Sequence, residues 1–278
     1  MQTPYQFNCG KYRLNLNRPH VMGIVNVTPD SFSDGGKYSN TDLAVAHALE
    51  LIAEGADILD IGGESTRPGA EPVSLDEELR RVIPVIEALS AVTTVPLSID
   101  TYKPEVMRQA IMAGADIVND VRALQEERAV EIVASSNAGV CLMHMQGVPQ
   151  TMQLAPDYQD VVAEVKQFLI ERMQVVMSAG IPQDRILLDP GFGFGKTTAH
   201  NIALIQHLDV IGELGPLLVG LSRKAVLGKI AGGDAQQRLH SGLAASVISA
   251  MKGAKIVRVH DVKATVDALK VVSAVLPS

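Results

Sequence analysis

Short apolar runs alternate with longer stretches of helical periodicity along most of the chain. In residues 41–54, for example, apolar side chains recur at the spacing of one helix face, which predicts a helix. The apolar runs are short and rich in Val, Ile and Leu, as buried parallel strands are. They predict strands over residues 21–25, 58–61, 97–99, 117–118, 140–143, 186–188, 217–221 and 256–259. Eight strands, each followed by a helix, predict an α/β fold of the (β/α)8 or TIM-barrel type.

Several predicted helices end in the same sequence pattern. Residues 54–60 (EGADILD), 113–119 (AGADIVN) and 252–258 (KGAKIVR) each place a glycine shortly before a predicted strand. Glycine favours the left-handed conformation that ends a helix, so each pattern predicts a helix end. The irregular spacing of the three copies excludes a repeat array. Ser74 and Glu77 stand at the capping-box spacing and predict the start of another helix.

The chain is predicted to form a single domain over residues 1–278, with residues 1–20 as an N-terminal extension that leads into the first strand. Its length is close to the ~250 residues that are typical of such a barrel. An open, doubly wound sheet is the structural alternative. That fold usually carries a glycine-rich turn after its first strand, and here residues 26–30 read NVTPD. The barrel is therefore favoured.

The composition narrows the class of protein. Hydrophobic residues make up 47% of the chain, enough for a large core, and the net charge is −7. A nucleic-acid-binding protein needs a dominant basic face, so nucleic acid is not an expected partner. No apolar run reaches the ~18 residues of a membrane span, and the polar N-terminus does not resemble a signal peptide. Cys9 and Cys141 have no metal or disulfide spacing, so we expect a cytoplasmic protein.

A glycine-rich segment, GFGFGKT at residues 191–197, invites a nucleotide-binding interpretation. A Walker A loop requires a glycine where Pro190 stands, and the dinucleotide-binding motif requires a third glycine where Lys196 stands. Both interpretations therefore fail. The glycines instead predict a tight backbone turn beside a flat ligand, with an ordinary flexible loop as the alternative.

Polar side chains follow nearly every predicted strand. In a barrel, the C-terminal ends of the strands meet at one mouth, where the catalytic groups of such enzymes lie. A single Asp or Asn at such a point is usually a helix cap or a turn residue, but a whole ring of polar groups predicts an active site. The ring comprises Asn26, residues 62–67, Asp100, Asn119, Asp120, His144, Asp189, Ser222, Arg223, Lys224, Arg258 and His260.

Three residues of this ring supply hydrogen-bond acceptors for the polar edge of a flat heterocycle: Asp100, Asn119 and Asp189. Asn119 can also donate. Asn26 offers a neutral oxygen of the kind that joins a Mg2+ shell completed by phosphate and water. We interpret His144 as structural rather than catalytic.

Three cationic or N–H-bearing side chains follow the last two predicted strands, where barrels often bind phosphate: Lys224, Arg258 and His260. The alternation of an extended segment puts Arg258 and His260 on one side, although a surface pair is the alternative. Lys224 stands at the start of a predicted helix, where the helix dipole disfavours a cation. A functional lysine is therefore favoured over a solvated one.

Two long segments resemble the signatures of the bacterial dihydropteroate synthases, a group of pterin-binding enzymes. They are MGIVNVTPDSFSDGG at residues 22–36 and DIGGESTRPG at residues 60–69. Later blocks of the family match in order: SIDT at 98–101, VNDVR at 118–122, LDPGFGFGK at 188–196, GLSRK at 220–224 and IVRVHD at 256–261. The resemblance covers about residue 21 to the C-terminus, and no motif position departs from the family pattern.

The resemblance implies a role for each matching residue. The pterin would be held by Asp100, Asn119, Asp189 and Lys224, in a pocket formed with Met143 and Phe194. The pyrophosphate would be bound by Thr66, Arg67, Arg258 and His260, with Mg2+ at Asn26. The p-aminobenzoate would be bordered by Phe32, Pro68, Ser222 and Lys224. The catalytic residues would be Asp100, Lys224, Arg258 and His260.

The resemblance also implies a reaction. Its substrates would be 6-hydroxymethyl-7,8-dihydropterin pyrophosphate and p-aminobenzoate, and its products 7,8-dihydropteroate and pyrophosphate. We expect an SN1-like path assisted by Mg2+, with the loop over residues 28–36 closing to exclude water. The resemblance further implies a homodimer.

Three other functions stay open on the sequence alone. A barrel that transfers a methyl group from methyltetrahydrofolate to a corrinoid would share the pterin acceptors but would not need cations for pyrophosphate. A Schiff-base aldolase would use Lys224, which lies just past a predicted strand and not within one. A non-catalytic pterin-binding protein would keep Asp100 and Asn119, yet Lys224 and Arg258 are also intact.

Overall fold

The computed structural model describes residues 6–28, 40–65, 69–148 and 151–275. Its main sheet is parallel throughout and has the strand order β8-β7-β6-β5-β4-β3-β10-β9. The two edges meet where Leu188 bridges Leu217, so the sheet is a nearly closed barrel. The strands are β3 (His20–Asn26), β4 (Ile58–Gly62), β5 (Leu97–Asp100), β6 (Ile117–Asp120), β7 (Gly139–Met143), β8 (Ile186–Asp189), β9 (Leu218–Val219) and β10 (Ile256–Val259).

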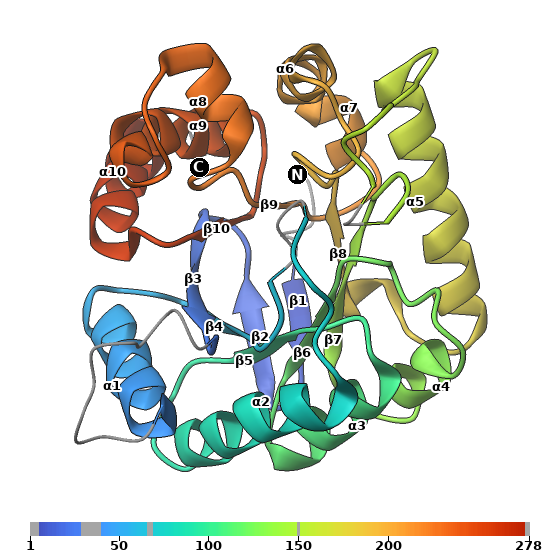
Figure 1. Ribbon diagram of the computed structural model, residues 1–278, viewed down its shortest axis with the longest axis vertical. Helices are drawn as coiled ribbons and strands as arrows, with labels where there is room; N and C mark the ends of the chain where they lie inside the picture. The colour runs from blue at the N-terminus through green and yellow to red at the C-terminus, as the bar shows by residue number, and fades with distance from the viewer. Residues whose placement is uncertain (1–5, 29–39, 66–68, 149–150, 276–278) are drawn as a thin grey trace.

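Helices surround the strands, as Figure 1 shows in a view onto the C-terminal ends of the strands. Within the described part of the chain they are α1 (Asn40–Ala53), α2 (Leu75–Ser90), α3 (Pro104–Ala113), α4 (Ala129–Ala134), α5 (Val161–Ser178), α6 (Thr198–Gln206), α7 (Leu208–Gly212), α8 (Ala225–Ala231), α9 (Leu239–Met251) and α10 (Val262–Val275). Because the strands form a ring with helices outside it, the (β/α)8 prediction is confirmed and the open doubly wound sheet is excluded.

The predicted helix ends and the predicted helix cap are present in the structure. Gly55, Gly114 and Gly253 have φ angles of 103°, 114° and 99°, the left-handed region in which glycine ends a helix without strain. The Ser74 side chain accepts a hydrogen bond of 3.3 Å from the backbone N–H of Glu77 and so caps α2. Each of the eight predicted strands is present. Only β9 is clearly shorter than predicted, because the chain leaves the sheet after its second residue.

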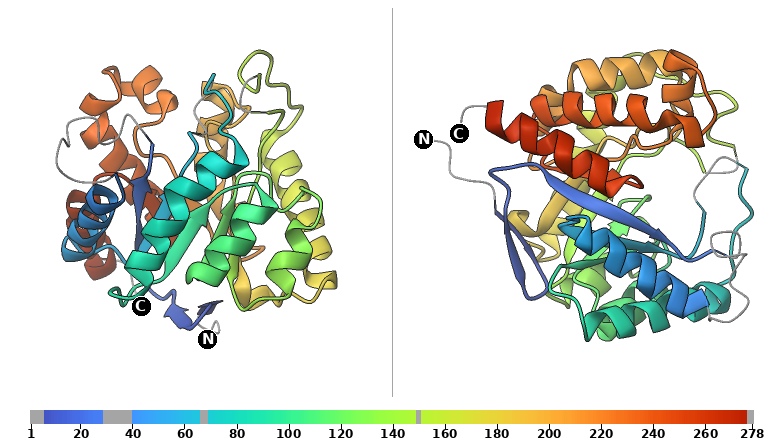
Figure 2. Two further views of the ribbon diagram at one scale, coloured as in Figure 1. Left: turned by 60° about the horizontal axis from the view of Figure 1, so that its bottom comes forward. Right: turned by 90° about the vertical axis from the view of Figure 1, so that its left-hand side faces the viewer.

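The N-terminal extension closes the barrel at the end where the strands begin. It forms an antiparallel hairpin of β1 (Gln6–Cys9) and β2 (Tyr12–Asn15), seen beside the N-terminus in Figure 2. Phe7 is fully buried against the lowest layer of barrel side chains. A Cβ on Gly139 would lie 2.5 Å from the Phe7 ring, so the hairpin packs directly on β7. The opposite mouth is thereby left as the place for a ligand.

The interior changes from apolar to polar along the strands. Ile58 and Ile117 belong to the lower apolar cluster, while Asp60 and Asn119, two residues further on, are buried polar groups. Because side chains two apart on a strand face the same side, these polar groups also point into the barrel.

Among the described helices, none is long and apolar enough to cross a membrane.

Candidate active site

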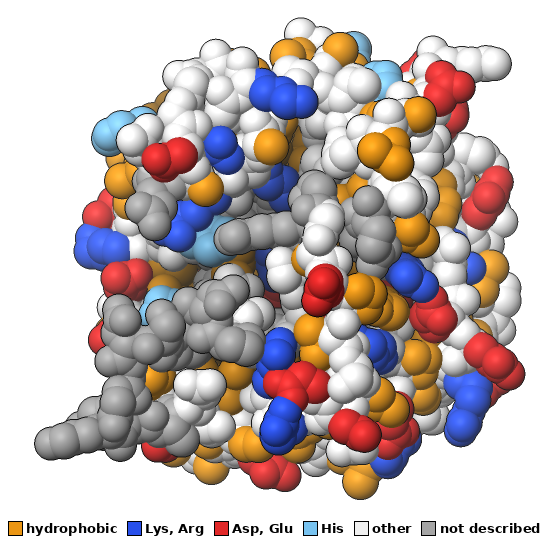
Figure 3. Space-filling view, in the orientation of Figure 1, with side chains coloured by type: hydrophobic (Ala, Val, Ile, Leu, Met, Phe, Trp, Pro, Cys, Tyr) orange, Lys and Arg blue, Asp and Glu red, His pale blue; other side chains and the backbone are white. Residues whose placement is uncertain are grey.

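The polar layer joins side chains from strands that are far apart in the sequence. Asp100 and Asn119 pair across β5 and β6, and Met143 and Asp189 pair across β7 and β8. Lys, Arg and His side chains gather near the centre of this face of the molecule (Figure 3). The described members of the predicted ring of polar groups are therefore brought together at one mouth.

Arg258 lies between two buried carboxylates. Its Nε donates to Asp60 Oδ2 at 2.5 Å, and its Nη2 donates to Asp100 Oδ2 at 2.7 Å. Asn119 donates from Nδ2 to the same oxygen of Asp60 at 3.1 Å. The other oxygen of Asp60, Oδ1, is buried and has no hydrogen-bond partner among the described residues. One guanidinium thus orients acceptors from two different strands.

Burial changes the pKa values of the ionisable side chains around Arg258. Burial raises the pKa of Asp100 to about 7, although Arg258 acts in the opposite direction. For Arg258, burial lowers the pKa, but the carboxylates of Asp60 and Asp100 outweigh it and leave the pKa above its ordinary value. The guanidinium therefore stays charged, and Asp100 is poised between an acceptor and a donor near neutral pH.

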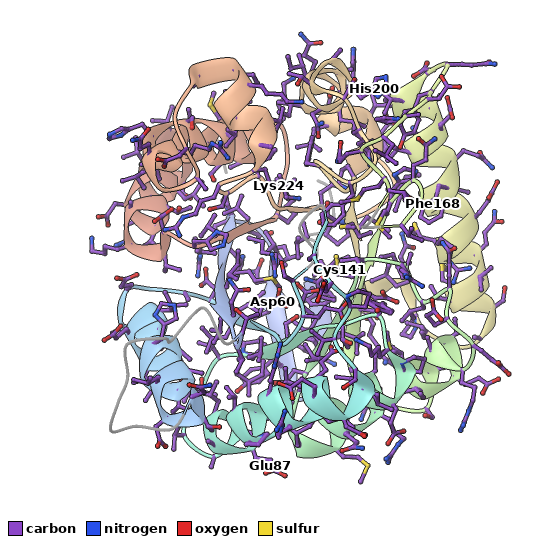
Figure 4. The ribbon with its side chains drawn as sticks, viewed as in Figure 1. Asp60, Glu87, Cys141, Phe168, His200 and Lys224 are labelled. Atoms are coloured by element: carbon purple, nitrogen blue, oxygen red, sulfur yellow. The ribbon has the colours of Figure 1, made fainter. Side chains whose placement is uncertain are left out.

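Lys224 and Asp189 form a second polar group on the other side of the mouth. The Lys224 ammonium donates to the carbonyl of Phe192 and lies 4.5 Å from the centre of the Phe194 ring. Asp189 Oδ1 accepts a 2.7 Å hydrogen bond from the Gly191 N–H. Burial lowers the pKa of Lys224 to about 8, and burial raises the pKa of Asp189. Figure 4 labels Asp60 among the strands and Lys224 on the side of α8, which begins at the next residue.

An apolar cluster borders these polar groups. Val121, Met143, Met152 and Phe194 pack together, with Tyr102 and Met145 against them. Met143 and Phe194 were predicted to form a pterin pocket together, and the structure places them in contact with one cluster. Apolar faces beside convergent acceptors suit a flat, polar-edged heterocycle.

Ser222 and His260 lie together after the last two strands of the barrel. The Ser222 hydroxyl is 3.1 Å from His260 Nδ1, and it also accepts a 3.2 Å hydrogen bond from the His260 N–H. Next to them, Arg223 forms a 2.7 Å ion pair with Asp261. Asn26 ends β3 and pairs with Gly62 of β4, at the rim of the same mouth.

Four predicted site residues lie outside the described residues: Phe32, Thr66, Arg67 and Pro68. Most of the loop over residues 28–36, which we expect to close over the site, lies outside them as well. Their assignments therefore stay predictions.

The sequence analysis did not single out Asp60 as a site residue. A period-two signal was available, because Ile58, Asp60 and Gly62 fall on one face of a strand whose lower end is apolar. A fully buried carboxylate at the centre of a barrel needs a partner, which Arg258 supplies. His144, interpreted as structural, is buried beneath the mouth and contacts Lys196.

Comparison with known proteins identifies the class to which this fold and site belong. Residues 22–260 match the family described as pterin binding enzymes. A dihydropteroate synthase of Escherichia coli K12 is 53% identical over 264 residues, covering 95% of this chain and 94% of its own. The chain therefore belongs to the pterin-binding enzymes and, within them, to the dihydropteroate synthases, which transfer an alkyl group other than methyl.

Solved structures support the same assignment. A dihydropteroate synthase of Xanthomonas albilineans with 4-aminobenzoic acid has 55% identity and a TM-score of 0.94, covering 99% of this chain and 100% of its own. The Xanthomonas albilineans enzyme in complex with 7,8-dihydropteroate has 52% identity and a TM-score of 0.89, covering 98% and 100%.

Proposed function

We propose that this chain works as a single domain that condenses 6-hydroxymethyl-7,8-dihydropterin pyrophosphate with p-aminobenzoate to give 7,8-dihydropteroate and pyrophosphate. One observation carries the proposal: hydrogen-bond acceptors from β5, β6 and β8 converge with a half-buried lysine at one barrel mouth, beside an apolar wall. The residues concerned are Asp100, Asn119, Asp189, Lys224 and Phe194.

The pterin is bound by its polar edge in this proposal. Its ring N–H and exocyclic amine form a donor–donor edge that a carboxylate such as Asp100 can accept. Lys224 donates to the Phe192 carbonyl and is attracted by the charge of Asp189, and it supplies an ammonium for a ring acceptor. Phe194 and Met143 cover the ring face. These contacts fix the methylene group of the substrate toward the open mouth.

The reaction breaks one C–O bond and forms one C–N bond. Cleavage of the C–O bond leaves the electron pair on pyrophosphate and electron deficiency at the pterin methylene, which the electron-rich dihydropterin ring delocalises. Arg258 and His260 stabilise the departing anion electrostatically. The aniline nitrogen of p-aminobenzoate then attacks the methylene and loses one proton. No covalent enzyme intermediate is required.

The residues present suit a magnesium ion that arrives with pyrophosphate. Among the described residues, no three His, Cys, Asp or Glu side chains gather to hold a metal ion. Asn26 offers one neutral oxygen at the rim, which fits Mg2+ because this ion usually keeps water and phosphate oxygens as ligands. Bound there, Mg2+ would neutralise charge on the pyrophosphate. Calorimetry should therefore detect Mg2+ binding only with pyrophosphate present, and equal binding without it would contradict this role.

The direct test is turnover. The purified protein is incubated with the pterin pyrophosphate, p-aminobenzoate and Mg2+, and dihydropteroate is measured by mass. Parallel reactions supply methyltetrahydrofolate and a corrinoid. Formation of dihydropteroate supports the proposal, whereas methyl transfer without dihydropteroate would favour the corrinoid methyltransferase. A protein that binds the pterin and turns over neither substrate would be the non-catalytic alternative.

We also propose a homodimer, supported by the outer faces of α9 and α10. These helices pack against each other (Figure 1). Ile248, Met251, Val271 and Val275 are 45%, 59%, 65% and 74% exposed, so this pair of helices presents apolar side chains that a second copy of the chain could cover. Sedimentation should give twice the mass of the chain, and the double variant Met251→Glu, Val271→Glu should give a monomer. A monomeric parent protein at micromolar concentration would overturn the proposal.

The proposed location is the cytoplasm. Cys9 and Cys141 are both buried and unpaired, as expected for a protein in a reducing compartment. Synthase activity in the cytoplasmic fraction of the source cells would support this location, and activity confined to a membrane or secreted fraction would contradict it.

A further inference from the structure

Lys196 is a buried lysine that the proposed reaction does not use. Its side chain ends the glycine-rich segment, and the residue is only 3% exposed. Its Nζ lies 2.9 Å from the Gly191 carbonyl, 3.0 Å from the Phe194 carbonyl and 2.9 Å from His144 Nδ1. An ammonium has three N–H donors, and these three acceptors can take all of them. No ion pair between described residues includes Lys196.

The surroundings keep His144 in the state that this arrangement needs. Burial, with a contribution from Lys196, lowers the pKa of His144 to about 3, so the imidazole is neutral and Nδ1 can accept. The ring also packs edge-on against Phe168 at 4.9 Å. Burial lowers the pKa of Lys196 as well, although the nearby carboxylate of Asp189 acts in the opposite direction, and burying a lysine without a direct ion pair is costly. A lysine that is buried at this cost in free energy is expected to have a structural or functional role.

The backbone of residues 190–196, which we call the glycine loop, wraps around this ammonium. Gly191 has a φ of 70°, and a Cβ there would lie 1.8 Å from the His144 carbonyl oxygen. Gly195 has a φ of 61°, and a Cβ there would lie 2.4 Å from the Gln146 carbonyl oxygen. The glycines therefore let the loop approach the residues after β7, and the lysine side chain holds it there through carbonyls of the loop itself.

The same loop also contacts the side chain of Lys224. The Phe192 carbonyl accepts from the Lys224 ammonium, and the Phe194 ring lies beneath that ammonium at 4.5 Å. A Cβ on Gly193 would lie 3.2 Å from Lys224 Cδ, so the lysine stem rests on the loop. Lys196 thus contacts the loop at Gly191 and Phe194, and Lys224 contacts the same stretch at Phe192 and Phe194.

We propose that Lys196 is a positioning residue for the synthase site: its ammonium fixes the glycine loop so that Phe192 and Phe194 hold Lys224 toward the pterin. The predicted effect on pterin binding rests on the proposed function. The positioning of Lys224 by the glycine loop does not rest on it, because it concerns only contacts within the protein. Lys196 acts through Lys224, so loss of the two side chains should not have independent effects on pterin binding.

A double-mutant cycle tests this coupling. Lys196→Met should weaken binding of the pterin pyrophosphate about tenfold or more. Lys224→Met should weaken it further, and the double variant should match Lys224→Met within about threefold, because the loop has nothing left to position. The matched control is Lys252→Met, which removes another lysine that donates 2.8 Å to a backbone carbonyl, that of Gln206, and should leave binding unchanged.

The outcomes separate the hypotheses. If Lys196→Met and Lys224→Met multiply their effects in the double variant, or if Lys196→Met alone binds within about threefold of the parent, the proposal is wrong. If Lys196→Met fails to fold by thermal melting, the same cycle is run with Lys196→Gln, which keeps an N–H donor. A parent protein that binds the pterin pyrophosphate but forms no dihydropteroate would refute the proposed function and leave the coupling testable.

Discussion

Arg258 Nη2 donates to Asp100 Oδ2 at 2.7 Å, so the cation assigned to pyrophosphate also orients the carboxylate assigned to the pterin. The same guanidinium donates from Nε to Asp60, which in turn accepts from Asn119. In the proposed binding mode, the two halves of the substrate would thus be linked through one side chain. Such preorganisation lowers the cost of ordering the acceptors when the ligand binds.

Replacing Arg258 by Leu should destabilise the protein by about 3–5 kcal/mol, because two buried carboxylates lose the cation between them. The loss should be larger at pH 8 than at pH 5. Burial raises the pKa of Asp100 to about 7 with Arg258 in place, and removal of the cation raises it further. A carboxyl group whose pKa is raised by folding lowers stability as the pH rises toward that folded-state pKa.

Thermal melts of the parent protein and Arg258→Leu at both pH values measure this effect. The difference in Tm should widen from pH 5 to pH 8. A constant difference would show that Arg258 does not compensate the buried carboxylates.

Replacing Lys224 by Arg should lower kcat/KM for the pterin substrate about tenfold or more at pH 7. The reason is that a wide planar guanidinium does not fit the space occupied by a compact ammonium. The pH profile gives a second readout. Burial lowers the pKa of Lys224 to about 8, so in the parent protein kcat/KM should fall as the pH rises through 8 and the ammonium loses its charge. Arginine does not titrate there, so the variant should lack this alkaline decline. A variant with parental kcat/KM would mean that charge alone matters at this position.

Binding of the two substrates should be ordered. In the proposed reaction p-aminobenzoate attacks the pterin methylene, so the bound pterin would form part of its site, and the predicted border residues Ser222 and Lys224 would supply only one side of it. Calorimetry should show that p-aminobenzoate binds at least about tenfold more tightly when pterin and pyrophosphate are present than to the protein alone. Equal affinity in both titrations would refute the ordered scheme.

The fold could be predicted from the sequence because its signals are local. Parallel strands buried on both faces appear as short apolar runs, and residues such as Gly55 and Gly114 mark the helix ends between them. The mouth could be predicted because every strand of a barrel ends there. The position of Asp100 therefore followed from that of its strand.

The partners within the site could not be predicted in the same way. Arg258 and Asp60 are 198 residues apart, and no local pattern shows that one guanidinium serves two carboxylates. The burial of Lys196 could not be predicted from the sequence either, because a lysine after a glycine-rich turn usually extends into solvent. Only the closed barrel shows which acceptors surround its ammonium.

We propose that Asp100 binds the polar edge of the pterin. Asparagine keeps the shape of aspartate but replaces one acceptor by an NH2 donor, which then faces a donor of the ligand. Such a mismatch in a buried pocket should cost about 2–5 kcal/mol, or roughly 30-fold to several-thousand-fold in affinity. The matched control is Asp120→Asn. Asp120 is also buried, with a pKa raised to about 7 by burial, but it accepts from the backbone N–H groups of Arg122 and Leu124.

The decisive measurement is therefore the affinity of Asp100→Asn for the pterin pyrophosphate, in a variant shown by thermal melting to be folded. We predict at least about a 30-fold loss for Asp100→Asn and less than about threefold for Asp120→Asn. A loss under about threefold for Asp100→Asn would contradict the account, because Asp100 would then be a cap or turn residue and not the acceptor of the pterin edge.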